Sequence, residues 1–240
     1  MRRDKITFIF ALLLIFLSTA TYSNAAGKTI YWYPKRSGPS KYNNIKAHAF
    51  KAGYMLKMLE KNSQISTLNP DKDSIVIASF DSDLLIKLSD FVDGGGKAIL
   101  LIGECQKVDK VNDLLIEKFG FALAFEREPR VIKYKEISGG KISHLWKGLN
   151  VGAEPASKNI GDWSYEAVVS NHIIVRDEKT VMAQYNGKAI SILMPKGKGE
   201  LLVICVPKAS HGMETLFADN RIEQRDNKKA FSRILNWVGK

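Results

Sequence analysis

Polar and nucleophilic side chains follow several apolar stretches of the sequence, each at the point where a predicted strand ends. These residues are Tyr33, Asp81, Glu104, Cys105, Gln106, Ser210 and His211. Thiol, imidazole and carboxylate groups supply nucleophiles, bases and hydrogen-bond partners in protein sites. Open α/β sheets bind their ligands beyond the carboxyl ends of their strands. We therefore predict a site at one sheet edge, with the ligand-binding residues Asp81, Glu104, Gln106 and Ser210.

Asp81 has a second interpretation, because it directly precedes a predicted helix. Asp and Ser side chains commonly accept a hydrogen bond from the first free backbone amides of a helix. Asp81 or Ser82 could serve only as this cap. The sequence leaves both roles of Asp81 open.

The two cysteines, Cys105 and Cys205, each lie at the end of an apolar, strand-like run. An oxidising compartment permits a disulfide between them if the strands are neighbours, and the alternative is two buried free thiols. Their wide spacing, without paired histidines nearby, does not match a metal site. We interpret His48, His144 and His172 as structural or surface residues, and we expect no metal and no cofactor.

Strands and helices alternate along the first half of the chain. Strands are predicted at residues 29–33, 74–79, 98–102 and 121–125. Apolar residues at helical spacing predict helices over 40–61, over 81–92 and over 108–119. The run at 98–102 is apolar at every position, as expected of a strand that is covered on both faces. This alternation is typical of βαβ units and a parallel sheet.

The pattern changes at residues 131–206, where strand-like stretches alternate with turns. Stretches at 173–176, 181–185, 189–194 and 200–206 predict a meander, with a hairpin turn at Asn186-Gly187. A final helix is predicted over 226–238. We therefore predict an α/β fold with a mainly parallel central sheet, as one domain over 26–240 that includes a β-rich insertion at 131–206.

The first 25 residues have the layout of a secretory signal peptide. Basic residues precede an apolar run over 6–17, and small residues follow up to Ala25. The apolar run is shorter than the roughly 20 residues that a membrane-spanning helix needs. We expect cleavage after Ala25 and export, to the periplasm or the medium if the source is bacterial. After signal removal the chain is not expected to span a membrane.

The chain carries a formal charge of +11, from 36 basic and 25 acidic residues. Loss of three basic residues and one acidic residue with the leader lowers this charge to +9. The remaining lysines are spread along the chain, without the basic stripe and exposed aromatic side chains of a nucleic-acid binder. We expect no nucleic-acid partner. An unknown small ligand or a protein partner fits better.

Two glycine-containing segments together resemble the class I glutamine amidotransferase-like superfamily. The first is Gly94-Gly95-Gly96 between a helix and the strand at 98–102, and the second is Gly197-Lys198-Gly199 before the strand at 200–206. The terminal helix that ends in Asn236-Trp237-Val238 completes the resemblance. The resemblance implies a three-layer, flavodoxin-like sandwich over roughly 28–240. It is closest to the non-catalytic exported or accessory members of that superfamily.

Catalytic members of that superfamily carry a cysteine on a sharp turn between strand and helix, in a Gly-x-Cys-x-Gly pattern. Here Cys105 occupies the matching place, but Lys107 stands where the second glycine would be. The resemblance also implies His211 as a base and Glu214 as its orienting partner, although the usual spacing is His-x-Glu. Cys105, His211 and Glu214 are therefore the catalytic candidates if the protein is an enzyme.

Two functions from different classes follow. The leading hypothesis is a non-catalytic domain that binds a ligand or a protein partner at the carboxyl edge of its sheet. The alternative is a cysteine-dependent hydrolase or amidotransferase-type enzyme. The distance between Cys105 and His211, and the reactivity of the Cys105 thiol, distinguish the two.

Overall fold

A sheet flanked by helices dominates the computed structural model, which describes residues 28–33, 42–77, 82–102, 109–133, 166–177, 180–185, 187–205, 222–223 and 227–239. The first half contains β1 (Thr29–Tyr33), α2 (Asn43–Lys51), β2 (Met55–Met58), the short 3-10 helix η2 (Asn62–Thr67), β3 (Asp73–Ile77), α3 (Ser82–Asp93), β4 (Lys97–Ile102) and α4 (Asp109–Phe119). The second half contains β5 (Phe121–Lys133), β6 (Glu166–Val175), β7 (Val181–Tyr185), β8 (Lys188–Lys196), β9 (Gly199–Cys205) and α5 (Asn227–Gly239).

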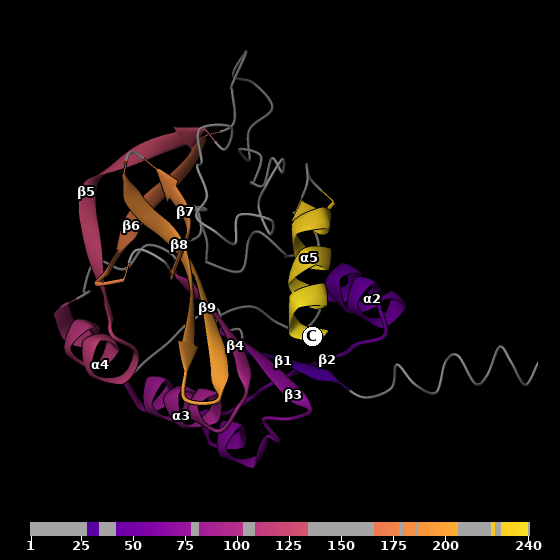
Figure 1. Cartoon of the computed structure of the whole chain (residues 1–240). Coiled ribbons are helices and arrows are strands. Elements are labelled where there is room, and N and C mark those ends of the chain that lie inside the picture. The colour runs from indigo at the N-terminus through magenta and orange to yellow at the C-terminus, as the bar shows by residue number, and fades with distance from the viewer. Residues whose placement is uncertain are drawn as a thin grey trace, which may run out of the picture.

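The described strands form one mixed sheet of nine strands, in the order β2-β1-β3-β4-β9-β8-β6-β5, with β7 paired to β8. The first five strands in this order are mutually parallel. The strands beyond β9 pair in antiparallel fashion. The structure thus confirms the predicted α/β class and the mainly parallel core (Figure 1).

Alternate residues of the central strands enter two separate hydrophobic clusters. Along β4, Ala98 and Leu100 belong to one cluster, whereas Ile99 and Leu101 belong to the other. The first cluster also contains the buried side chains of α3 and α4, and the second contains those of α2 and α5. Figure 1 shows α2 beside α5, well away from α3 and α4. Burial on both faces explains why the run at 98–102 is apolar at every position.

The prediction of one helix over 40–61 is wrong. The helix α2 ends at Lys51, Gly53 has φ 85°, and the chain then forms β2. A positive φ suits glycine and stops a helix, because other residues meet a steric cost there. The apolar side chain of Leu56, expected on the helix, lies instead on a strand that pairs in parallel with β1.

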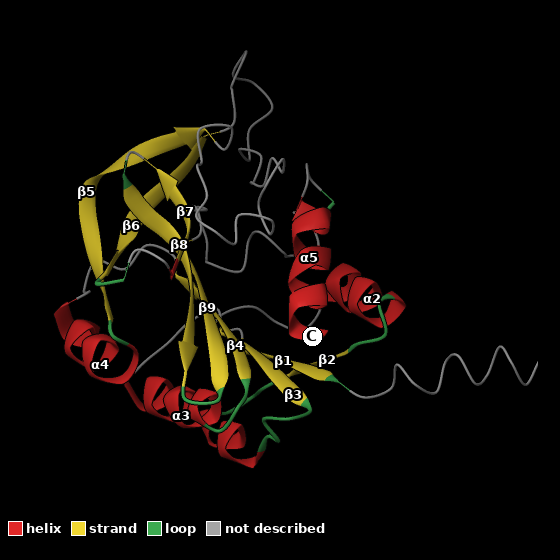
Figure 2. Cartoon of the chain, in the orientation of Figure 1, coloured by secondary structure: helices red, strands yellow, loops and turns green. Residues whose placement is uncertain are grey.

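The predicted meander is correct for β7, β8 and β9, which pair in chain order, and wrong for β6, which pairs with β8 instead of β7. β9 lies between β4 and β8, as Figure 2 shows. β6 pairs with β5 and β8, and among the described strands β7 pairs with β8 alone. The predicted hairpin between β7 and β8 is confirmed, with Tyr185 opposite Lys188 and Gly187 at φ 74°. The strands of the β-rich part therefore continue the central sheet.

The two glycine segments that carry the family resemblance lie against each other. The Glu200 N–H donates to the Gly96 carbonyl oxygen at 3.3 Å, and the Lys198 N–H donates to the Asp93 carbonyl oxygen at 3.2 Å. A Cβ at Gly199 would lie 2.2 Å from the Gly96 carbonyl oxygen. Glycine is needed because two backbones approach here more closely than any side chain allows. This junction lies at the amino ends of β4 and β9, opposite the predicted site.

Among the described residues, no helix is both long enough and apolar enough to cross a membrane.

Candidate functional site

The carboxyl ends of four neighbouring parallel strands lie along one edge of the sheet. Tyr33 at the end of β1 is in register with Ile77 at the end of β3. Ile77 in turn aligns with Leu100 of β4, and Ile102 aligns with Cys205, the last residue of β9. This is the edge at which open α/β sheets bind ligands.

The predicted site residues all lie outside the described residues. Asp81 belongs to the segment 78–81, which follows β3. Glu104, Cys105 and Gln106 belong to 103–108, which follows β4. Ser210, His211 and Glu214 belong to the segment that follows β9.

The topology determines where these three segments begin. β3 pairs with β4, and β4 pairs with β9, so three adjacent strand ends lead directly into the segments that carry the candidate residues. The sequence alone placed Cys105 and His211 after two strands, but it did not show that those strands are neighbours. The roles of the individual side chains at this edge stay predictions.

Cys205 is a free thiol that is buried in the core. The structure therefore does not contain the disulfide with Cys105 that the sequence left open. Burial away from water disfavours the thiolate and raises the pKa of the Cys205 thiol far above its usual value. A thiol in this state is a poor nucleophile at neutral pH, so Cys205 serves packing.

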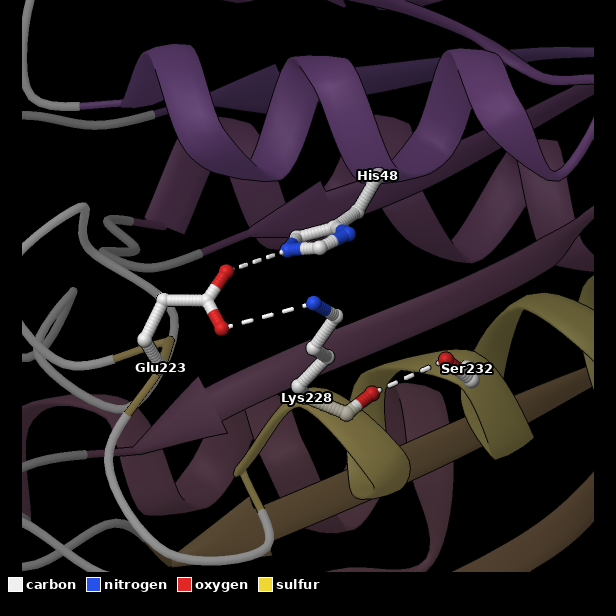
Figure 3. A network of polar contacts seen from close by, with 4 residues as sticks. All are labelled: His48, Glu223, Lys228 and Ser232. Carbon is white, nitrogen blue, oxygen red and sulfur yellow. Dashed lines mark hydrogen bonds and ion pairs between the residues drawn. The ribbon is translucent and has the colours of Figure 1, made fainter.

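A polar network that sequence reasoning missed joins α2 to the chain just before α5 (Figure 3). His48 Nε2 lies 2.7 Å from Glu223 Oε1, and Lys228 Nζ lies 3.4 Å from Glu223 Oε2. The Ser232 hydroxyl donates to the Lys228 carbonyl oxygen at 2.9 Å within the first turns of α5. His48 and Glu223 are 175 positions apart, so no local pattern could have revealed the contact.

The hydrogen bond from His48, with a smaller contribution from Lys228, lowers the pKa of the Glu223 carboxyl. The preceding residue, Ile222, is fully buried in the cluster that contains α2 and α5. The hydrogen bonds of Glu223 and the burial of Ile222 thus hold two successive residues against α2 and α5. We assign this network to the attachment of residues 222–223 to α2 and α5, at the far end of the segment that starts after Cys205.

The described residues contain no group of three or more His, Cys, Asp or Glu side chains arranged to bind a metal ion. His172 lies within β6, opposite Ala124, and is partly buried. His144 lies outside the described residues.

Comparisons with known proteins identify similar folds but no family. No family model matches the chain, and no curated protein matches it. A cytoplasmic protein of Salmonella typhimurium LT2 superposes with a TM-score of 0.52 and 11% identity over 88% of this chain and 99% of its own. The N-terminal domain of mmIFT52 superposes with a TM-score of 0.53 and 14% identity, over 89% and 97% of the two chains.

A GMP synthase-type protein from Thermoplasma acidophilum has 12% identity over 89% of this chain and 94% of its own. Its TM-score of 0.49 is too low to carry weight. At these identities, the other two matches show a shared fold alone. They accord with the mixed α/β sheet described above.

Proposed function

We propose that this chain is an exported, non-catalytic amidotransferase-like domain that binds a ligand or a protein partner at the carboxyl edge of its sheet. The observation that carries the proposal is the adjacency of β3, β4 and β9. Their ends lead into the segments with Asp81, Glu104 to Gln106, and Ser210. Three segments rich in hydrogen-bonding side chains that begin at one edge are a typical basis for recognition in this fold class.

The finer assignment, a three-layer flavodoxin-like sandwich, is part of this proposal. Its support comes from the two hydrophobic clusters, which contain different helices on the two sides of the central strands. The contact between Gly96 and Gly199 adds to this support, because both belong to the segments on which the resemblance depends.

Binding is favoured over catalysis by the residue at position 107. A glycine there would allow the tight backbone turn that exposes a nucleophilic cysteine, and this chain has Lys107. The Cβ of a lysine restricts such a turn, since positive φ angles cost a non-glycine residue free energy. The Gly-x-Cys-x-Gly pattern therefore lacks the glycine that the catalytic turn needs.

The test combines calorimetry with hydrogen exchange, using L-glutamine, L-glutamate and the tripeptide Gly-Glu-Gly as probes. We expect at least one probe to bind and to slow backbone exchange at the ends of β3, β4 and β9. Glu104→Gln and Ser210→Ala should weaken that binding about tenfold, the effect of a lost charge-assisted hydrogen bond. Lys198→Met, at the opposite edge, is the matched control and should bind normally.

Protection from exchange at any other part of the molecule would contradict the proposed location. Turnover of a substrate by the wild type that disappears in Cys105→Ala would contradict the non-catalytic assignment. Binding that survives both Glu104→Gln and Ser210→Ala would exclude these two residues from the site.

A second candidate function has one observation in its favour. Because Cys205 is a free thiol, the Cys105 thiol is not consumed in a disulfide with it. This leaves the alternative of a hydrolase or amidotransferase-type enzyme with Cys105 as nucleophile, His211 as base and Glu214 as orienting residue. The test is release of ammonia from L-glutamine and hydrolysis of p-nitrophenyl acetate. Enzyme-dependent rates that vanish in both Cys105→Ala and His211→Ala would support it.

A further inference from the structure

The two edge strands of the sheet, β5 and β2, differ in whether a described side chain hydrogen-bonds to their outward backbone groups. On the β5 side, the side-chain amide of Asn112 accepts from the Leu123 N–H at 2.8 Å and donates to the Leu123 carbonyl oxygen at 2.9 Å. Asn112 thereby satisfies the backbone of an edge strand, as proteins commonly do to prevent unwanted pairing. Within the described part of the chain, nothing comparable covers β2, the strand at the opposite end.

The hydrogen bonds of β2 show which backbone groups face outward. The Met55 N–H donates to the Lys28 carbonyl oxygen at 3.3 Å, and the Leu59 N–H donates to the Trp32 carbonyl oxygen at 2.8 Å. Successive residues of a strand direct their backbone groups to opposite sides. Leu56 and Met58 therefore direct their N–H and C=O groups away from β1, as a template for one more strand.

The stretch of chain that contains β2 is basic. Residues 42–61 contain four lysines and a single acidic residue, Glu60. Lys51, Lys57 and Lys61 are exposed, and the Lys57 ammonium lies 6.0 Å from the centre of the Tyr31 ring. Met55, two positions before Lys57 and on the same face of β2, is 56% exposed. An added strand would thus meet one apolar and one cationic side chain on that face.

We propose that the free edge of β2 binds an extended, acidic segment of a partner protein, which adds to the sheet as a further strand. Main-chain hydrogen bonds to Leu56 and Met58 provide affinity, and a carboxylate beside Lys57 provides selectivity. A second copy of this chain is disfavoured, because pairing of two β2 edges would place like charges together. This surface is distinct from the carboxyl edge and does not depend on the function proposed there.

The probe is a fluorescein-labelled peptide of sequence Asp-Val-Glu-Val-Asp-Val-Glu, and binding to the purified protein is followed by fluorescence anisotropy. Met58→Pro removes an outward N–H and a side chain that packs against the second cluster, but it breaks no hydrogen bond to β1, so the fold should persist. We expect Met58→Pro and Lys57→Glu each to weaken binding about tenfold. Lys198→Glu makes the same charge change at a distant turn and should alter the affinity less than twofold.

Hydrogen exchange of individual amides provides the independent readout. In the free protein the Leu56 and Met58 amides should exchange rapidly, and they should become protected when the peptide binds. The fold of each variant is checked by circular dichroism, so that lost binding is not mistaken for unfolding. Lys57→Glu keeps the backbone unchanged and tests the charge requirement even if Met58→Pro does not fold.

Four results would overturn the proposal. The acidic peptide does not bind, or a peptide with Lys in place of Asp and Glu binds equally well. The Leu56 and Met58 amides are protected before any peptide is added, which would show that the chain covers its own edge. The protein forms dimers that Met58→Pro dissociates, which would assign the edge to a second copy.

Discussion

The ammonium group of Lys97, at the start of β4, donates a hydrogen bond of 2.9 Å to the carbonyl oxygen of Trp237 in the last turn of α5. Lys97 also lies 5.3 Å from the centre of the Trp237 ring and 3.4 Å from the Glu200 carboxylate. Lys28 donates to the next carbonyl oxygens, at 3.1 Å and 3.3 Å. Two cations thus satisfy the free carbonyl groups at the negative end of this helix.

Lys97→Met should lower the free energy of unfolding by about 1–2 kcal/mol, because a hydrogen bond and a helix-end charge interaction are lost together. The measurement is urea denaturation at neutral pH. Lys198→Met, an equal change in charge at an exposed turn, should alter the free energy by less than about 0.5 kcal/mol. Equal effects of the two variants would show that Lys97 does not anchor α5.

Gly199→Ala should lower the free energy of unfolding far more than Gly187→Ala. A Cβ at Gly199 would lie within 2.4 Å of backbone oxygens of both Gly96 and Val92, and backbone cannot move aside as a side chain can. We expect Gly199→Ala to lower the free energy of unfolding by about 3 kcal/mol or more. A Cβ added at Gly187 would meet no other part of the described chain within 4 Å, apart from its own chain neighbours. Only the φ of 74° is therefore unfavourable, at a cost of about 1–2 kcal/mol. Thermal denaturation of the two purified variants compares them, and similar losses would contradict the close contact.

The Glu223 network predicts a pH-dependent contribution to stability. The pKa of Glu223 is lower in the folded protein than its ordinary value of 4.5, so the contribution is fully present above that value. It is lost as the pH falls through the lowered folded-state pKa. The stability advantage of the wild type over Glu223→Gln should therefore hold at pH 6 and shrink towards pH 3, as measured by urea denaturation.

Glu60→Gln is the control for the loss of one exposed carboxylate. Glu60 is also exposed, and no ion pair of its carboxylate occurs among the described residues. At pH 6, Glu60→Gln should lower the free energy of unfolding less than Glu223→Gln does, because it removes no ion pair. A Glu223→Gln difference that stays constant from pH 6 to pH 3 would contradict the role of His48 and Lys228.

The buried Cys205 thiol should resist alkylation in the folded protein. In the Cys105→Ala variant, iodoacetamide at pH 8 should label no thiol under native conditions and one thiol in urea, because burial both blocks access and raises the pKa of Cys205. Mass spectrometry of the labelled protein measures this. Labelling of folded Cys105→Ala as fast as in urea would show that β9 opens readily at its end.

Local patterns were sufficient for the elements whose signals are local. The strands β1 and β4 and the helices α3, α4 and α5 were predicted within one or two residues. Apolar periodicity, turn glycines and continuous apolar runs act over a few positions, so one segment of sequence contains the whole signal. The same reasoning failed for β2, because Leu56 and Leu59 are three positions apart, the spacing of one helix face. In the structure the two side chains instead enter different hydrophobic clusters.

The sequence by itself determined the α/β class and which residues follow the strand ends. Only the tertiary structure decided that β9 lies beside β4, that β2 is an edge strand of the sheet, and that His48 meets Glu223. These relationships join segments far apart in the chain, and each depends on which backbone edges pair and which faces are buried. A local pattern does not contain that information, because the free energy of such pairing comes from contacts that exist only once the chain has folded.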